Sequence, residues 1–487
     1  MTRSEIRFIL NGEDVALSAV RPDETLLDYL RLRRSLRGTK EGCAEGDCGA
    51  CTVLVGRLAG GGLVYEGVNA CIRFLGSLDG CHVVTVEHLK RADGTLHPVQ
   101  QAMVDFHGSQ CGFCTPGFVM SLYALWMREP APSDAAIEKA LQGNLCRCTG
   151  YEPIVKAARA FGDYGEVAND PRASERAEMA GRLAALRDGL RVEIGQGKDR
   201  LVVPGSLDDL AEFLEAEPQA TIVAGSTDVG LWVTKHMRDI APVVFIGGVD
   251  ELREVVEDET SITLGANVSY TDAYRSLGAR IPAWRDLLDR IGGDQVRNMG
   301  TIGGNIANGS PIGDSPPPLI ALGATLTLRK GSETRILPLK DFFIDYGKQD
   351  RRPGEFVQSV TVPLPNPGAL YRVYKVTKRR DEDITAVLGA FHIEIENGRC
   401  VSARIAYGGM AATPKRAKAV EAVLVGRDWN EAAIEEAMDA LAKDFAPISD
   451  MRASAEYRML AARNLIRRLH LETVGAERVT LQRYEEA

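Results

Sequence analysis

The sequence lacks the features that mark membrane, secreted and nucleic-acid-binding proteins. None of its apolar runs approaches the roughly 20 residues that a membrane-spanning helix needs, and the longest, FVMSLYALWM, is typical of a buried helix. The N-terminal segment MTRSEIRFIL is charged and contains no signal-peptide core. A net charge of −9 disfavours nucleic acid and anionic membranes as partners. These absences predict a cytoplasmic protein, and a chain of 487 residues predicts several domains.

Motifs for catalysis by side chains are also missing. The seven histidines form no HxH or HxxxH pair, and no nucleophile stands out beside a base. There is no GxGxxG, which disfavours a Rossmann dinucleotide-binding fold. Any reaction in which the chain takes part must therefore be carried by cofactors, while the protein sets their positions and potentials.

Cysteine is scarce in most of the chain and concentrated near its start. Of the ten cysteines, only Cys400 lies after residue 148. Disulfides are rare in a reducing cytoplasm, so clustered cysteines there more often bind metal or carry electrons. Cys81 and Cys400 stand apart from the clusters and are interpreted as small buried hydrophobic residues. The other cysteines divide into two sets of four.

The first set begins in the segment EGCAEGDCGACT. Cys43, Cys48 and Cys51 are separated by four and then two residues, and Cys71 follows. This is the plant-type ferredoxin spacing for a [2Fe–2S] cluster, which takes four thiolates. Interleaved glycines let the backbone turn its amides toward sulfur. The alternative is a four-cysteine zinc site, but such sites usually pair their cysteines as CxxC, unlike this triplet.

The sequence around these cysteines predicts a small β-grasp domain. A favoured turn pair, Asn11-Gly12, separates the first two predicted strands. Alternating and helical patterns predict the elements of this domain, namely strands over residues 6–10, 15–20, 51–56 and 82–87 and a helix over residues 25–33.

The second set consists of CGFC, with Cys111 and Cys114, and CRC, with Cys146 and Cys148. Each pair of thiolates is predicted at the start of a helix, where partial positive charge favours an anionic ligand set. Spacing alone leaves this set open to zinc as well as to an iron–sulfur cluster. Helical periodicity and capping residues predict four helices here, over residues 98–108, 116–129, 134–144 and 152–162.

Two glycine-rich stretches further along the chain are suited to a phosphate-containing cofactor. In TIVAGSTDVG, residues 221–230, a strand runs into a turn whose amides and hydroxyls can bind phosphate, although many such turns bind nothing. The stretch GTIGGNIANGSPIGD, residues 300–314, is too polar for a core strand and is predicted to be a loop with close backbone approach. Residues 165–195 are predicted to be a polar linker with one surface helix near 174–189.

Both cysteine segments match one family in order and spacing. SQCGFCTPGFVMSLYALW followed by GNLCRCTGYEPIVKA resembles the second [2Fe–2S] domain of the xanthine oxidase family of molybdenum hydroxylases. EGCAEGDCGACTV with Cys71 resembles that family's first cluster. The two glycine-rich stretches and then YKVTKRRDEDIT, residues 374–385, resemble its FAD domain in the same order. The resemblance therefore covers nearly the whole chain.

The resemblance implies the residues that hold three cofactors. The cysteine sets would hold two [2Fe–2S] clusters, one with Cys43, Cys48, Cys51 and Cys71 and the other with Cys111, Cys114, Cys146 and Cys148. The implied FAD residues are Ile222, Val223, Ala224, Gly225, Ser226, Thr227, Asp228, Val229, Ile291, Gly292, Thr301, Gly304, Asn305, Asn308, Ser310, Asp314 and Lys375.

Two of these assignments, and Asp383 beside them, carry a specific expectation. Lys375 is expected to approach the isoalloxazine, where a cation suits the charge of reduced flavin. Ile291 stands where animal members of the family often carry an aromatic residue over the flavin. Asp383 lies in a charged run that is also compatible with a solvated loop, and it is predicted to influence the flavin and nicotinamide site.

The expected architecture is a multidomain α+β protein. It comprises a β-grasp plant-type ferredoxin domain over residues 1–88, a four-helix [2Fe–2S] domain over 89–164, the linker over 165–195, an α+β FAD-binding domain without a Rossmann fold over 196–368, and a C-terminal α+β lobe over 369–487.

The function implied by the resemblance is electron transfer. A molybdenum-binding domain is far larger than any unassigned part of the sequence, so the molybdopterin cofactor is expected on a separate large subunit. The module order resembles the small, iron–sulfur/FAD subunit of the family's bacterial xanthine dehydrogenases. This implies electrons passing from molybdenum through the two clusters to FAD and NAD⁺, while hypoxanthine is oxidised to xanthine and xanthine to urate. Two small and two large subunits are expected.

Two alternatives are open at this point. The same electron chain would equally serve a hydroxylase of aldehydes or N-heterocycles, because the substrate pocket belongs to the large subunit. The other alternative is a redox sensor or zinc-binding interaction module without enzymatic activity, which a second cofactor domain disfavours.

Overall fold

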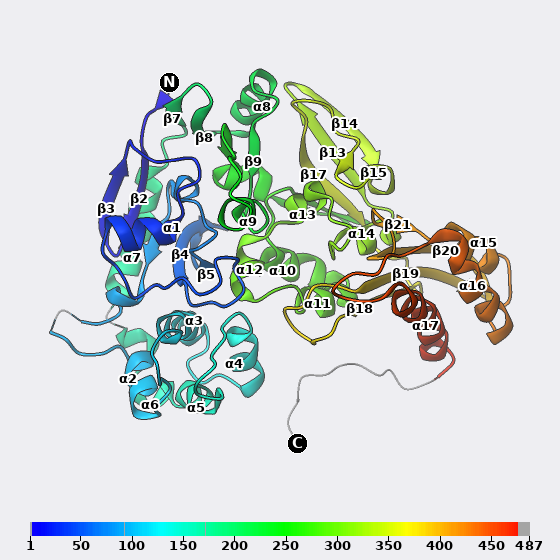
Figure 1. Ribbon diagram of the computed structural model, residues 1–487, viewed down its shortest axis with the longest axis horizontal. Coiled ribbons are helices and arrows are strands. Elements are labelled where there is room, and N and C mark those ends of the chain that lie inside the picture. Colours follow the sequence, from blue (N-terminus) through cyan, green and yellow to red (C-terminus); the bar gives the residue numbers. More distant parts are fainter. Residues whose placement is uncertain (1, 92, 171, 476–487) are drawn as a thin grey trace.

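The computed structural model describes residues 2–91, 93–170 and 172–475. Figure 1 shows an N-terminal sheet, a group of helices beside it, a central region with two sheets, and a C-terminal lobe on the far side. In the described ranges, no helix is both long and apolar enough to cross a membrane. This arrangement is the expected multidomain α+β architecture.

The first part is a five-stranded sheet with the order β3-β2-β6-β4-β5. β2 and β3 form the predicted hairpin, and its turn residues have positive φ, 51° at Asn11 and 84° at Gly12, as a type I′ turn requires. The sequence patterns missed β5, which pairs with β4 along its whole length. The elements are β2 (Ile6–Leu10), β3 (Glu13–Leu17), α1 (Leu26–Asp28) with a π-helical turn (Tyr29–Arg33), β4 (Thr52–Ala59), β5 (Gly62–Asn69) and β6 (His82–Val84).

The second part packs four main helices, as the sequence predicts. A proline, Pro116, lies in the first turn of α3, and Ser133 caps α4 by accepting a hydrogen bond from the Ala136 backbone N–H at 3.3 Å. Large apolar side chains such as Phe118 and Trp126 fill the centre. The helices are α2 (Pro98–Asp105), α3 (Thr115–Arg128), α4 (Asp134–Leu141), α5 (Glu152–Arg159) and the short α6 (Phe161–Tyr164).

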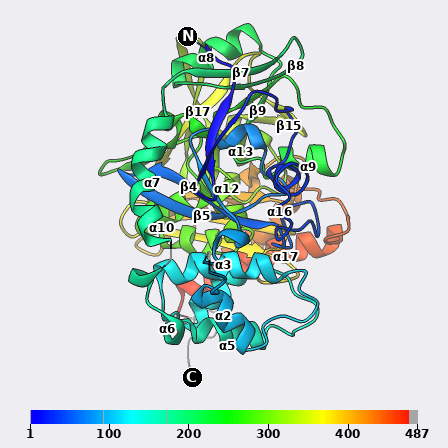
Figure 2. The same cartoon turned by 90° about the vertical axis from the view of Figure 1, so that its left-hand side faces the viewer.

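The predicted linker is docked against the rest of the molecule. Its helix α7 (Ala173–Leu186) packs along β2, β4 and β5 of the first sheet (Figure 2). There it buries Met179 and Leu183 completely. Just before the helix, Asp170 accepts a hydrogen bond from the Tyr123 hydroxyl of α3 at 2.9 Å. The segment therefore ties the two cysteine-bearing domains together.

The third part contains two five-stranded sheets. One has the order β1-β7-β8-β10-β9, so β1 belongs to this part and runs parallel to β7, although it precedes the first sheet in sequence. The other has the order β11-β12-β17-β13-β14. The strands are β1 (Thr2–Arg3), β7 (Arg191–Gln196), β8 (Asp199–Val203), β9 (Thr221–Val223), β10 (Val243–Phe245), β11 (Val255–Glu257), β12 (Ser261–Gly265), β13 (Thr325–Lys330), β14 (Glu333–Pro338), β15 (Phe343–Asp345), β16 (Lys348–Gln349) and β17 (Phe356–Pro363).

Short helices cover these sheets, and most of them share one apolar core, whereas Leu231 and Met299 pack with the core of the first sheet. The helices are α8 (Leu207–Ala216), α9 (Val229–Thr234), α10 (Tyr270–Arg280), α11 (Pro282–Leu288), α12 (Asp294–Met299), α13 (Ile302–Asn308) and α14 (Pro316–Leu322).

The second glycine-rich stretch contains the helix α13, where the sequence predicts a loop. Thr301 caps this helix by accepting a hydrogen bond from its third backbone N–H at 3.0 Å. Gly303 permits close packing, because a Cβ there would lie 2.5 Å from the Cβ of Ala266. The loop prediction was wrong here because the cap and this tertiary contact outweigh the poor helix propensity of glycine.

The C-terminal lobe is a four-stranded sheet, β18-β19-β20-β21, with three helices. α14 of the third part packs on β19 and β20, which joins the lobe firmly to that part. The elements are β18 (Leu370–Val376), β19 (Val387–Glu396), β20 (Arg399–Gly408), β21 (Lys415–Arg416), α15 (Lys418–Leu424), α16 (Glu431–Asp444) and α17 (Ala455–Thr473).

Candidate cofactor sites

The fold brings the four thiols of the first set together. The sulfurs of Cys51 and Cys71 are buried and lie 3.3 Å apart. The backbone N–H of Cys48 donates to Cys43 Sγ at 3.3 Å. A hydrogen bond from the Cys48 thiol is the main cause that holds the pKa of Cys43 far below its usual value. Gly42 is needed beside them, because a Cβ there would lie 2.8 Å from Cys48 Sγ.

The second set pairs one cysteine from each of its two loops. The thiol of Cys111 hydrogen-bonds with that of Cys148, and the thiol of Cys114 with that of Cys146. Cys114 is the residue directly before α3, as predicted. The backbone N–H of Cys146 donates to the Tyr151 hydroxyl at 3.0 Å. Cys111 and Cys148 are exposed, so this site opens to the surface.

The second set has the arrangement that a two-iron cluster takes. Its thiols lie in two pairs, Cys111 with Cys148 and Cys114 with Cys146. In a [2Fe–2S] cluster each of two irons takes two thiolates. In the first set, Cys43 contacts both Cys48 and Cys71, and Cys71 also contacts Cys51.

The two cysteine loops contact each other directly. The backbone N–H of Leu145, next to Cys146, donates to the carbonyl oxygen of Cys48 at 3.0 Å. Gly49 approaches the second loop so closely that a Cβ on it would lie 2.1 Å from the Gly143 carbonyl oxygen. A backbone hydrogen bond thus joins the segments that carry the cysteines of the two sets.

A cavity of about 350 Å³ lies between the two glycine-rich stretches. Its size falls within the range of small-molecule and cofactor pockets. Val223 is buried behind its wall. Most of the residues assigned to FAD by resemblance line it, namely Ile222, Ala224, Gly225, Ser226, Thr227, Asp228, Val229, Thr301, Gly304, Asn305 and Asn308.

The first glycine-rich stretch makes a tight turn at this cavity. Ser226 has a φ of 60°, and a Cβ on Gly225 would lie 1.6 Å from the Met299 carbonyl oxygen. Burial raises the pKa of Asp228, which faces the cavity. A backbone turn of small residues with hydroxyl side chains beside it suits a diphosphate.

The other residues assigned to FAD lie outside the lining of this cavity. Lys375 Nζ binds Asp314 Oδ2 at 2.6 Å, and both side chains are almost completely buried. Thr385 Oγ1 donates to the second Asp314 oxygen at 2.5 Å. Lys375 also donates to the carbonyl oxygen of Arg290 at 3.1 Å, directly before Ile291. These contacts hold one ammonium group beside the segment predicted to line the flavin.

Gly292 and Ser310 lie close in sequence to Arg290 and Asp314, which contact Lys375. Gly292 has a φ of 51°, a conformation that favours glycine. Ser310 Oγ accepts a hydrogen bond from the Ile312 backbone N–H at 3.4 Å in the turn after α13. Their contact with FAD stays a prediction.

The charged run at residues 378–384 folds back on itself beside the first cysteine loop. Asp383 accepts a hydrogen bond from the Arg379 backbone N–H at 2.9 Å and another from the residue that follows it. Burial alone would raise the pKa of Asp383, but these hydrogen bonds lower it overall. Burial raises the pKa of Glu382 to about 8, and the Asp47 carboxylate adds to this effect. An influence of Asp383 on a nicotinamide site stays a prediction.

The sequence patterns missed several residues that line the cavity. Trp232 on α9 and Tyr270 on α10 add aromatic surface, and Arg351 adds a positive charge. Trp232 lies in the helix that directly follows the glycine turn, so its position in the sequence could have indicated that it lines the cavity. Tyr270 and Arg351 come from distant segments, and no local motif marks them.

Four family descriptions match successive parts of the chain. They are the 2Fe-2S iron-sulfur cluster binding domain over residues 8–72, the [2Fe-2S] binding domain over 85–159, the FAD binding domain in molybdopterin dehydrogenase over 196–365, and the CO dehydrogenase flavoprotein C-terminal domain over 372–473.

Xanthine dehydrogenases are among the similar proteins. The chain is 34% identical to the xanthine dehydrogenase of Emericella nidulans over 90% of its own length. It is 31% identical to xanthine dehydrogenase 1 of Arabidopsis thaliana over 91%. The chain spans 36% and 37% of the lengths of these two relatives.

Solved structures match somewhat more than half of the chain. One chain of CO dehydrogenase from Oligotropha carboxidovorans matches with a TM-score of 0.51 and 30% identity, over 55% of this chain and 94% of that one. A chain of quinoline 2-oxidoreductase from Pseudomonas putida 86 matches with a TM-score of 0.52 and 25% identity, over 56% and 96%. With its two cysteine sets, the cavity lined by its predicted FAD residues and these matches, the chain belongs to the xanthine oxidase family of molybdenum hydroxylases, as an iron–sulfur and FAD-binding part.

Proposed function

We propose that this chain is the electron-transfer subunit of a xanthine dehydrogenase and carries electrons from a molybdenum centre on a partner subunit to NAD⁺. The proposed route runs from the second cluster to the first and then to FAD, and the oxidised substrates are hypoxanthine and xanthine. When bound, the clusters supply one-electron chemistry and FAD supplies hydride chemistry. The observation that carries the proposal is that protein segments at the three cofactor sites contact one another directly.

Helix α9 makes the contact between the FAD cavity and the first cysteine loop. The helix begins at the cavity turn, and at its end Thr234 Oγ1 donates to the carbonyl oxygen of the residue after Cys43 at 2.6 Å. Lys235 Nζ donates to the Cys43 carbonyl oxygen at 2.5 Å. Gly230 lets the helix touch Ile72, next to Cys71, because a Cβ there would lie 2.7 Å from the Ile72 Cβ. This helix therefore holds the first cysteine set at a fixed place relative to the cavity.

The surface at the second cysteine set suits the partner subunit. Phe113 is 45% exposed, Leu145 41% and Tyr151 38%, and they surround the exposed Cys111 and Cys148 in sequence. We call these five residues the cluster face. Exposed apolar groups gathered at a functional centre are typical of interaction sites. We place the molybdenum subunit on the cluster face, in a heterotetramer of two small and two large chains.

The proposed substrate is inferred from similar proteins. Identities of 34% and 31% to proteins named xanthine dehydrogenase support xanthine. NAD⁺ as the acceptor is taken from the resemblance of the sequence alone. The second candidate is the same electron-transfer role for a hydroxylase of another substrate. The quinoline 2-oxidoreductase and CO dehydrogenase matches favour it, because both cover almost all of the matched chain.

The test uses the complex as purified from its own host. Xanthine is added without oxygen, and the visible spectrum is recorded. Loss of flavin and iron–sulfur absorbance is expected, because electrons from xanthine reach this chain. No change with xanthine, combined with bleaching by NADH, would move the substrate to another molybdenum hydroxylase. A purified protein that contains zinc and no flavin would contradict the proposal.

A further inference from the structure

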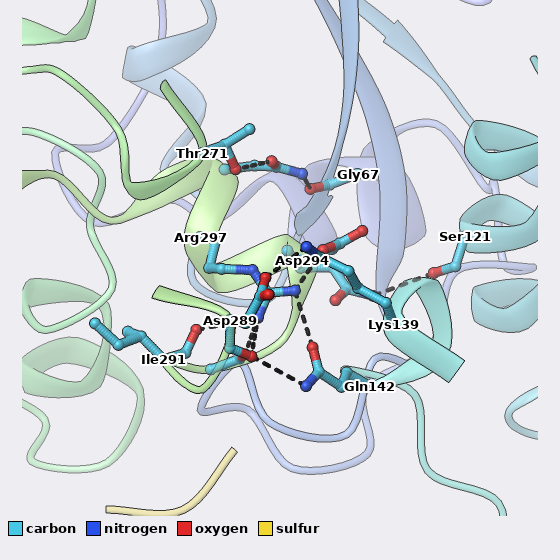
Figure 3. A network of polar contacts seen from close by, with 12 residues as sticks. Gly67, Ser121, Lys139, Gln142, Thr271, Asp289, Ile291, Asp294 and Arg297 are labelled. Carbon is cyan, nitrogen blue, oxygen red and sulfur yellow. Dashed lines mark hydrogen bonds and ion pairs between the residues drawn. The ribbon is translucent and has the colours of Figure 1, made fainter. Parts of the chain in front are cut away.

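The short helix α12 of the FAD domain lies where the three cofactor-binding domains meet (Figure 3). From this helix, Asn298 Nδ2 donates to the Gly67 carbonyl oxygen in the ferredoxin domain at 2.9 Å. Arg297 donates to Gln142 Oε1 in the four-helix domain at 2.9 Å. One element therefore holds both neighbouring domains through polar contacts at its surface.

Gln295 occupies the buried centre of this junction and is only 1% exposed. Its Nε2 lies 3.0 Å from Thr52 Oγ1, 3.1 Å from Ser121 Oγ and 3.1 Å from Asn144 Oδ1. The Thr52 hydroxyl donates to the Gly49 carbonyl oxygen at 2.7 Å, and the Ser121 hydroxyl donates to Asn144 Oδ1 at 2.7 Å. Since both hydroxyl protons are used, these oxygens are left to accept from the Gln295 amide.

Two of the three partners of Gln295, Thr52 and Asn144, lie within two residues of a cysteine of the two sets. Thr52 directly follows Cys51, a ligand of the first set. Asn144 lies two residues before Cys146 of the second set, and its Nδ2 also donates to the Gly49 carbonyl oxygen at 3.3 Å. Gln295 itself is three residues after Gly292, in the segment assigned to the flavin. A single side-chain amide thus touches the supports of all three cofactors.

We propose that Gln295 is a positioning residue for electron transfer, which sets the separations of the two clusters and the flavin by joining the three domains that hold them. The inference rests on the proposed function. Electron transfer slows steeply with distance, so a small loosening of this junction changes rates without removing a cofactor. The Gln295 Nε2 contacts oxygens in both neighbouring domains, while its Oε1 has no hydrogen-bond partner among the described residues. The directed Nε2 contacts restrict how the three domains are arranged.

The test removes the side-chain amide of Gln295 while keeping the length of the side chain. In the complete complex, Gln295→Met keeps the unbranched side chain and its packing but removes the donor. Iron and flavin contents are measured first and are expected to match the wild type. After reduction with dithionite, EPR spectroscopy records the magnetic splitting between the two reduced clusters. We expect this splitting to weaken, and cluster reduction after rapid mixing with NADH to slow by tenfold or more.

Gln142→Met is the matched control at the same interface. In the part of the chain that the structure describes, Gln142 hydrogen-bonds only to Arg297 and to the Asp289 carbonyl oxygen, both in the FAD domain. Its splitting and reduction rate are expected to stay within twofold of the wild type. Ser121→Ala, which removes one acceptor of the Gln295 amide, is the second test variant and is expected to weaken the splitting if Gln295→Met does not accumulate.

The outcomes separate this inference from the proposed function. Wild-type splitting and rates in both Gln295→Met and Ser121→Ala would overturn the positioning role. An equal loss in Gln142→Met would also overturn it, because the effect would then belong to the whole interface. If the wild-type complex itself gave no signals from two [2Fe–2S] clusters with dithionite, the proposed function would fail instead.

Discussion

At the scale of single residues, one missing side chain decides how closely two backbones meet at the FAD cavity. Gly225 stands in the turn that the resemblance assigns to the FAD diphosphate, and the Met299 carbonyl oxygen occupies the place of its Cβ, at 1.6 Å. Backbone atoms cannot rotate away as a flexible side chain can. The turn therefore depends on a residue without a Cβ, whatever its hydroxyl neighbours contribute.

We expect Gly225→Ala to lose FAD. The added Cβ must push α12 and the turn apart, and overpacking of this kind costs about 1–3 kcal/mol or more. Flavin absorbance per chain after gel filtration measures the loss. Gly248→Ala is the matched control, since the nearest atom to a Cβ there is 4.0 Å away. Equal flavin contents in the two variants would contradict the role given to Gly225.

A second residue-scale prediction separates the clusters from the flavin. Cys114→Ser removes one thiolate of the second set, whereas the FAD cavity lies in another domain. We expect the variant to lose half of its iron and the EPR signal of one cluster. Bleaching of the flavin by NADH is expected to persist, while reduction by the substrate of the partner subunit stops. Loss of bleaching by NADH would refute this independence.

At the scale of elements, helix α7 covers a buried histidine of the ferredoxin sheet. The Tyr65 hydroxyl lies 2.7 Å from His82 Nδ1, and His82 Nε2 lies 3.4 Å from Glu175 Oε1 on α7. Burial lowers the pKa of His82 to about 4. The imidazole is therefore neutral in the folded chain at neutral pH.

This histidine predicts a loss of stability in mild acid. Between pH 6.5 and about 4 the unfolded chain binds a proton at His82 that the folded chain does not, so the free energy of unfolding falls as pH falls. The full effect is about 3 kcal/mol. Melting temperatures at pH 7 and pH 5 measure it for the wild type and for His82→Gln, which cannot titrate. The same decrease in both proteins would exclude His82 as the group responsible.

Elements also show how far the sequence predicts this structure. The cysteine spacings indicated where the thiols meet, because a cluster constrains its ligands locally in sequence. The hairpin at Asn11-Gly12 and the four helices followed from turn and capping chemistry in the same way. Helix α13 could not be predicted in this way, because its stability comes from the contact with Ala266. The role of Gln295 could also not be predicted from the sequence, since its hydrogen-bond partners lie in two other domains.

At the scale of the whole molecule, direct contacts connect the cofactor sites, and one of the two cysteine sets opens to the surface. The FAD cavity contacts the first cysteine loop through α9, and that loop contacts the second through the Leu145–Cys48 hydrogen bond. The second set alone has exposed cysteines. Under the proposed function, electrons from the partner subunit are therefore expected to enter at the cluster face.

We accordingly expect Phe113→Glu to prevent assembly with the molybdenum subunit. Phe113 is 45% exposed on the cluster face, and a charge there would be buried without a partner on docking. Co-purification with the large chain should be lost, while iron, flavin and bleaching by NADH remain. Ile336→Glu is the control, because Ile336 is 72% exposed on β14, far from the cysteines in sequence. Assembly of Phe113→Glu at the wild-type level would place the molybdenum subunit elsewhere, and electrons would then need another point of entry.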